Sequence, residues 1–197
     1  MGHQRLGRLP AHRLLPEIVR YLVTGGTPTE NLVRLVTEFG QDALKHALKD
    51  PVFIHALWLL VRLPQAAASK EFVADLRKLD VFVSPSPTLA DILVAYDNAL
   101  EGVQRRSNAV ATDLGEMARQ AGLAAIAETV QVRLPALWNP KPEDVRASLA
   151  AFRAPERFGE VAHKFFANFV ERVIHYFVDR DLHRIVGPER EIGRAHV

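Results

Sequence analysis

Apolar residues recur at helical spacing along most of the chain, starting near its N-terminus. A first helix is predicted over about residues 14–23, and Gly25-Gly26 separates it from a second one. The sequence TPTE at 27–30 is typical of a helix start, because threonine caps the first turn, proline fits its first position and glutamate completes a capping box. One face of the second segment is apolar: Leu32, Leu35, Val36 and Phe39. The two segments together predict a helical hairpin.

The most apolar segment of the chain follows. Asp50-Pro51 repeats the cap and proline signal and opens the sequence VFIHALWLLVRL, which is apolar on nearly all sides. We expect this helix, over residues 50–63, to be the buried centre of the fold. We expect Pro64 to end it, because proline lacks the N–H that a helix interior needs.

Three further helices are predicted in the middle of the chain. They cover about residues 69–79, a long stretch that starts at Ser86-Pro87, and residues 112–132, with a break at Gly122. Residues 81–83 are predicted to be an extended linker, because no neighbouring segment offers them a strand to pair with.

Residues 114–134, LGEMARQAGLAAIAETVQVRL, resemble a DNA-binding helix-turn-helix in the spacing of Ala118, Gly122 and Leu123. Glu128 and Gln131 depart from the motif, since they occupy positions that it fills with aliphatic core residues. We therefore expect an ordinary helical hairpin here.

Three prolines between residues 134 and 142 mark the best candidate for a boundary. We expect a helical bundle over 1–133, a proline-rich connection over 134–142, and C-terminal helices over 143–190 that pack on the bundle. These helices are predicted at about 143–152 and 155–185, the second ended by Gly187-Pro188. The predicted fold is all-α, an irregular multi-helix bundle of about eight helices with a long C-terminal helix.

The last seven residues, EIGRAHV, match the in-frame translation of a widely used sequencing adapter. We expect residues 191–197 to be foreign to the protein and its own reading frame to continue beyond Arg190, so that the chain is truncated.

Composition narrows the classes of protein. The 197 residues are 48% hydrophobic with a net charge of +2, which fits one soluble globular domain or two small ones. The lack of cysteine excludes disulfides, thiol nucleophiles and cysteine metal sites. The basic pI reflects 19 arginines, which suggest a bacterial source. The longest apolar run, 52–61, is interrupted by His55 and shorter than the ~20 residues of a membrane span, so we expect a cytoplasmic protein without membrane contact.

The last long helix carries a broad apolar stripe. Its largest members are Phe165, Phe166, Phe169, Val173 and Phe177. The stripe covers more than half of the circumference, so it has to be covered from two sides. It is therefore either a core helix or an interface to a partner.

Polar residues on the opposite side of this helix, Glu171, His175, Asp179 and His183, follow one another at i, i+4 spacing. Neighbours in such a row can share a divalent metal, which makes His175, Asp179 and His183 the metal candidates. The two histidines stand roughly 12 Å apart along the axis, so one ion cannot bind both. A solvated charged face is the simpler interpretation.

The leading functional hypothesis is a non-enzymatic helical protein–protein interaction module, an accessory subunit of a bacterial complex that binds a protein partner or a second copy. No catalytic set and no cofactor are predicted. The alternative is a nucleic-acid binder that uses the basic N-terminal arm with Arg105, Arg106 and Arg119. A third hypothesis is a metal-dependent enzyme built on the row of histidine and aspartate.

Overall fold

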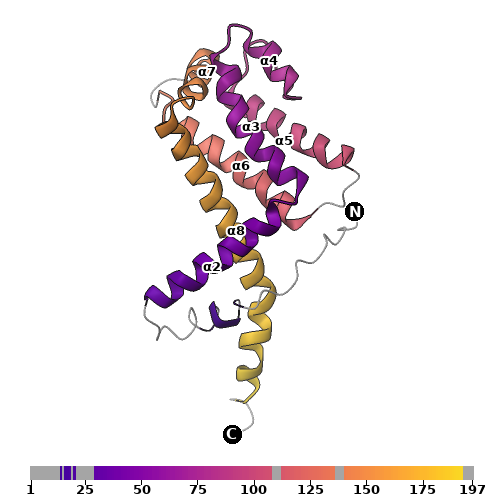
Figure 1. Cartoon of the computed structure of the whole chain (residues 1–197), viewed down its shortest axis with the longest axis vertical. Coiled ribbons are helices and arrows are strands. Elements are labelled where there is room, and N and C mark those ends of the chain that lie inside the picture. The colour runs from indigo at the N-terminus through magenta and orange to yellow at the C-terminus, as the bar shows by residue number, and fades with distance from the viewer. Residues whose placement is uncertain are drawn as a thin grey trace. The chain divides into compact units, whose positions relative to one another are not determined.

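The computed structural model describes residues 14, 16–18, 20, 29–107, 112–135 and 140–192, and for residues 29 and 180–192 the backbone alone. Helices dominate these residues, and no β-strand occurs among them, so the all-α prediction is confirmed (Figure 1). The helices are α2 (Thr29–Ala47), α3 (Pro51–Ala68), α4 (Phe72–Lys78), α5 (Leu89–Arg106), α6 (Asp113–Gln131), α7 (Pro142–Ala151) and α8 (Pro155–Ile192).

The described residues form two compact units. Unit 1 comprises the residues from Ala47 to Phe169, and unit 2 comprises those up to His46 and those from Val170 onward. Helix α8 contributes its first half to unit 1 and its second half to unit 2. The division into 1–133 and 143–190 stays a prediction.

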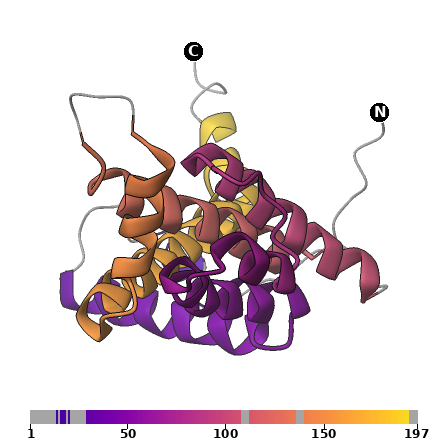
Figure 2. The same ribbon diagram turned by 90° about the horizontal axis from the view of Figure 1, so that it is seen from above.

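Helix α3 is the centre of unit 1. It packs against α4, α5, α6 and α7 (Figure 1 and, turned by 90°, Figure 2). The predicted cap at its start is confirmed: a carboxylate oxygen of Asp50 accepts from the backbone N–H of Val52 at 2.8 Å and of Phe53 at 3.1 Å. Thr112 donates its hydroxyl to the same carboxylate and accepts from Gly115 N–H at 2.9 Å. The starts of α3 and α6 are thereby tied together.

A close approach between α5 and α6 explains why α6 does not break at Gly122. The buried Tyr96 hydroxyl donates to the Ala56 carbonyl of α3 at 3.3 Å. A Cβ on Gly122 would stand 2.1 Å from that hydroxyl oxygen. Glycine is required here by space rather than by backbone conformation, so α6 is one continuous helix. The predicted break and hairpin are wrong.

Three predicted helix ends are also wrong. Helix α3 continues through Pro64 to Ala68, because burial of apolar residues around the proline outweighs one lost backbone hydrogen bond. Helix α5 begins at Leu89 rather than at Ser86, since Thr88 forms a capping box with Asp91. Helix α8 keeps its helical backbone to Ile192, past the glycine and proline at 187–188 where we expected it to end.

Unit 2 combines α2 with the second half of α8. The rings of Phe39 and Phe177 meet edge to face with centroids 5.4 Å apart, and both residues are buried. A Cβ on Gly40 would lie 3.4 Å from Val170, so α2 and α8 approach closely at that point. The first predicted helix and the start signal at Thr27-Pro28 fall largely outside the described residues.

Candidate interaction surface

Helix α3 has two very different faces. The face toward the other helices of unit 1 is buried. On the opposite side three large apolar residues are open: Ile54 is 49% exposed, Trp58 40% and Val61 43%. The expectation that α3 is buried on all sides is therefore wrong for this face, because α4 to α7 leave it uncovered.

All exposed positions of α3 except Arg62 follow a heptad. Ile54, Trp58, Val61, Gln65 and Ala68 are all exposed and are spaced by four, three, four and three residues. We call these five residues the α3 row. This spacing is that of the a and d positions with which one helix packs against another in a coiled coil.

Polar groups flank the row on one side. The His55 ring lies 4.8 Å from the ring of Trp58. The Arg62 guanidinium lies 5.9 Å from that ring and donates to Gln65 Oε1 at 2.9 Å. Arg62 is the single lysine, arginine, aspartate or glutamate in α3. The row is therefore apolar over its first two turns and bears one cation beyond them.

His55 is half-buried at the edge of the row. Its Nε2 atom is buried without a hydrogen-bond partner. Burial and the charge of Arg106 lower the pKa of His55 below its usual 6.5, against the opposing charge of Asp80. The neutral imidazole is favoured at this place.

A small groove of about 330 Å³ continues the row at its C-terminal end. Arg62, Gln65 and Ala66 line it from α3. The α4 side contributes Leu79 and the ion pair of Asp75 with Lys78, whose atoms are 2.7 Å apart. The groove is thus an extension of the row with polar walls.

A second groove of about 570 Å³ lies between α6 and the first half of α8 in unit 1. Two ion pairs stand at it, Lys164 with Glu128 at 2.8 Å and Arg133 with Glu160. A Cβ on Gly159 would meet nothing within 4 Å, which helps to open the groove. The charges that form it are largely neutralised by each other.

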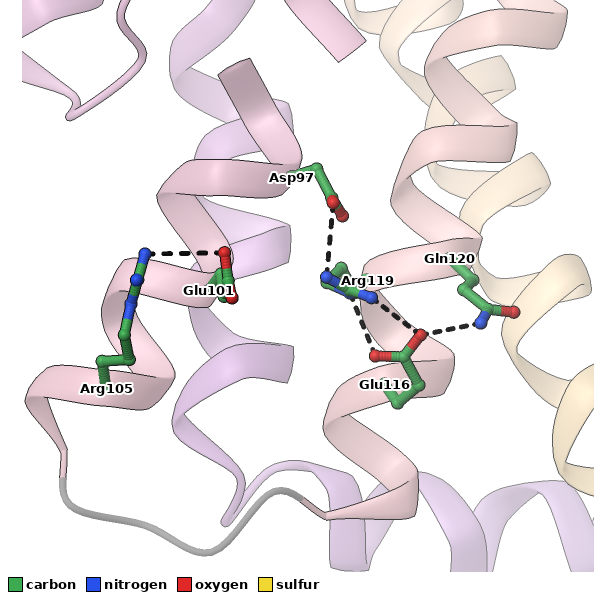
Figure 3. Close-up of polar contacts among 6 residues, drawn as sticks. All are labelled: Asp97, Glu101, Arg105, Glu116, Arg119 and Gln120. Atoms are coloured by element: carbon green, nitrogen blue, oxygen red, sulfur yellow. Dashed lines mark hydrogen bonds and ion pairs between the residues drawn. The ribbon is translucent and has the colours of Figure 1, made fainter. Parts of the chain in front are cut away.

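The three arginines predicted to bind nucleic acid each have a carboxylate partner. Arg105 lies 3.5 Å from Glu101, and Arg106 lies 2.9 Å from Asp80. Arg119, half-buried, contacts both Asp97 at 3.3 Å and Glu116 at 3.0 Å (Figure 3). A phosphate would have to displace these carboxylates, so their surroundings do not favour nucleic-acid binding.

Burial raises the pKa of the Asp97 carboxyl, and the nearby Arg119 guanidinium opposes that shift. Gln120 donates to Glu116 Oε1 at 2.7 Å and so holds this carboxylate at the arginine (Figure 3). The cluster therefore links α5 to α6 in the manner of a structural ion-pair network.

Of the predicted metal candidates, His175 and Asp179 lie in the described part of α8, whereas the side chain of His183 does not. His175 Nε2 stands 3.8 Å from Glu171, and both side chains are largely exposed. Among the described residues no group of three histidines or acidic residues is placed to hold a metal ion. The metal site stays a prediction.

The predicted aromatic interface lies mostly inside the chain. Phe165 and Phe169 are fully buried in unit 1, with ring centroids 5.7 and 5.0 Å from that of Phe53. Val173 and Phe177 are buried as well. Phe166 alone among the five is partly open, at 36%. Packing, the first of the two interpretations of this stripe, accounts for four of its residues.

Sequence reasoning missed the α3 row. The sequence does carry a signal for it: α3 is apolar on nearly all of its circumference, whereas a helix that packs on one surface can bury only part of it. The heptad spacing of Ile54, Trp58 and Val61, with His55 and Arg62 beside it, was the more specific sign.

By length and apolarity α3 could also cross a bilayer, and it is the one helix of the described residues that could; half of it is buried within the chain. Comparison with protein-family models, with curated proteins and with solved structures gives no match to the chain.

Proposed function

We propose that the chain is a non-enzymatic interaction module that binds a helix of another polypeptide through the α3 row. The observation that carries this proposal is the exposure of Ile54, Trp58 and Val61, side by side on the central helix of unit 1. Scattered apolar residues on a surface are ordinary, but three large ones on consecutive turns form a contiguous patch that gains free energy when it is covered.

The spacing of the row selects the kind of partner. Apolar anchors at i, i+4 and i+7 fit the apolar face of one helix, which meets them turn by turn. Trp58 lies between Ile54 and Val61 in the row, and tryptophan is among the residues that contribute most to binding when a partner excludes water. Membership as an accessory subunit in a bacterial cytoplasmic complex belongs to the same proposal; the arginine-rich composition supports the bacterial source.

The test uses a displayed library of helical peptides whose sequences are randomised at heptad positions. The bait is the full chain as wild type, as Val61→Glu, and as Val94→Glu. The last variant is the matched control, because Val94 is an exposed valine on another helix, α5. We expect peptides with apolar residues at three-four spacing, bound by the wild type and the control but at least tenfold more weakly by Val61→Glu.

Purified peptides then report on the site directly. Binding should shift the emission of Trp58 to shorter wavelength, whereas a Trp58→Phe variant should lose that signal and keep most of the affinity. Peptides that bind all three baits equally well would overturn the proposal, because the α3 row would then not be the binding surface.

A further inference from the structure

We infer that the partner of the α3 row is the α3 row of a second copy of this chain, packed antiparallel across a two-fold axis. This inference rests on the proposed function and names its partner. The geometry of α3 points to it: the buried residues of the helix occupy b, c and f positions and, at Pro64, one g position, whereas the five residues of the row, at a and d positions, are exposed. A second helix can therefore pack on the α3 row without any rearrangement of unit 1.

The α3 row is complementary to a second α3 row that runs in the opposite direction. Antiparallel packing brings each a position opposite a d position, so Trp58 meets Val61 of the second copy, and Ile54 meets Gln65 of the second copy. The two central layers then each combine the large Trp58 with the smaller Val61. A parallel pair would instead stack the two Trp58 side chains in one layer and two Gln65 amides in another, which packs less evenly.

Charge does not oppose this arrangement. The single charged residue of α3, Arg62, faces His55 of the second copy in the antiparallel register, because both occupy e positions. His55 favours its neutral form and has a buried Nε2 without a hydrogen-bond partner. Within α3 no like charges meet across the axis, and Arg106, whose charge acts on His55, is paired with Asp80 at 2.9 Å. The two helix dipoles run in opposite directions.

The size of the contact sets its strength. Helix α3 has 18 residues and is roughly 27 Å long at ~1.5 Å per residue. One helix pair of this length buries less area than the ~1,600 Å² of a standard interface. We therefore expect a reversible dimer that dissociates on dilution to low micromolar concentration.

The first experiment measures mass against concentration by sedimentation equilibrium. The wild type and Val94→Glu should approach the dimer mass at high concentration with the same dissociation constant. Val61→Glu places a carboxylate against Trp58 of the second copy and should weaken dimerisation at least tenfold. Circular dichroism and thermal unfolding of all three chains check that the variants remain folded, since both valines are exposed helical positions.

The second experiment determines direction and register. The chain has no cysteine, so introduced thiols report on one site only. In the antiparallel register Ile54→Cys and Gln65→Cys should form a disulfide-linked dimer only when the two variants are mixed. Each variant alone should not cross-link, because two equal positions are then 11 residues out of register, roughly 16 Å along the axis.

Each outcome bears on the inference. A chain that stays monomeric at millimolar concentration, or a dimer that Val61→Glu leaves intact, overturns it. Cross-linking of Ile54→Cys with itself overturns the antiparallel arrangement. A monomer that nevertheless binds helical peptides through Val61 overturns the second copy as partner and leaves the proposed function standing. Loss of both self-association and peptide binding through α3 would remove both proposals.

Discussion

The aromatic residues in the first half of α8 and the α3 row have similar sequence patterns but differ in burial. Both are apolar residues at helical spacing in strongly apolar segments. Phe165 and Phe169 are fully buried in unit 1, whereas Trp58 and Val61 are open. Four of the five large residues of the α8 stripe, for which core and interface were both open, are core. Helix α3, which we expected to be the buried centre, has one exposed face.

The difference lies in what stands opposite each stripe. Phe53, on the buried face of α3, packs against both phenylalanines of α8 at aromatic contact distance. The α3 row has no such counterpart among the described residues, because α4 to α7 pack on the other sides of α3. Apolarity therefore indicates a need for cover, and it does not specify which molecule supplies the cover.

The largest effect tests whether burial distinguishes the residues of α8, by truncation of two neighbouring phenylalanines of this helix. Phe165→Ala should lower the free energy of unfolding by about 3–5 kcal/mol, because it leaves a cavity against Phe53. Phe166→Ala, at a partly exposed position, should cost about 1 kcal/mol. Urea unfolding measures both. Equal losses would show that the two faces of α8 are not as different as their exposure indicates.

A smaller effect is expected where the buried face of α3 meets α5 and α6. Gly122→Ala should cost about 1–3 kcal/mol, because the new methyl group displaces the Tyr96 hydroxyl from Ala56. Gly159→Ala is the matched control in an open place and should stabilise the chain by up to about 1 kcal/mol. Unfolding curves that place Gly122→Ala at or above wild-type stability would contradict the close approach.

Truncation within the α3 row should have a small effect on folding stability and a large effect on association. Trp58→Ala should cost about 1–2 kcal/mol of folding stability, less than Phe165→Ala, since the side chain is partly exposed and its known ring contacts are those with His55 and Arg62. The same change should weaken helix binding at least tenfold. Unfolding of the dilute monomer gives the first quantity and sedimentation the second. A folding loss as large as that of Phe165→Ala would place Trp58 in the core.

The smallest effect concerns pH at the edge of the row. Because burial lowers the pKa of His55 below 6.5, the unfolded chain binds this proton more readily than the folded one. Stability from this source is present above pH 6.5 and is lost as the pH falls from there toward the folded pKa. The wild type should therefore lose more stability over this window than His55→Gln does. If the free energy of unfolding depends on pH in the same way in both chains, His55 is not the cause of the loss.

Local signals predicted much of the secondary structure. The cap of Asp50 on α3 and the start of α6 after Thr112 were readable because each depends on residues within one turn. Two of the wrong predictions have a shared cause: Pro64 and Gly122 look like helix breakers locally, and packing with distant residues, such as Tyr96 at Gly122, overrules that preference. The carboxylate partners of Arg106 and Arg119 on other elements were unreadable for the same reason. The start of α5 was missed although its capping box, Thr88 with Asp91, is local.

The sequence by itself determined that this chain folds as helices, where several of them begin, and that it carries more apolar helix surface than one neighbour can cover. Tertiary structure alone decided which stripe is covered from within, at Phe165 and Phe169, and which is left open, at Ile54, Trp58 and Val61. The physical reason is that helix propensity and capping act within a few residues, whereas burial depends on side chains that come from far along the chain.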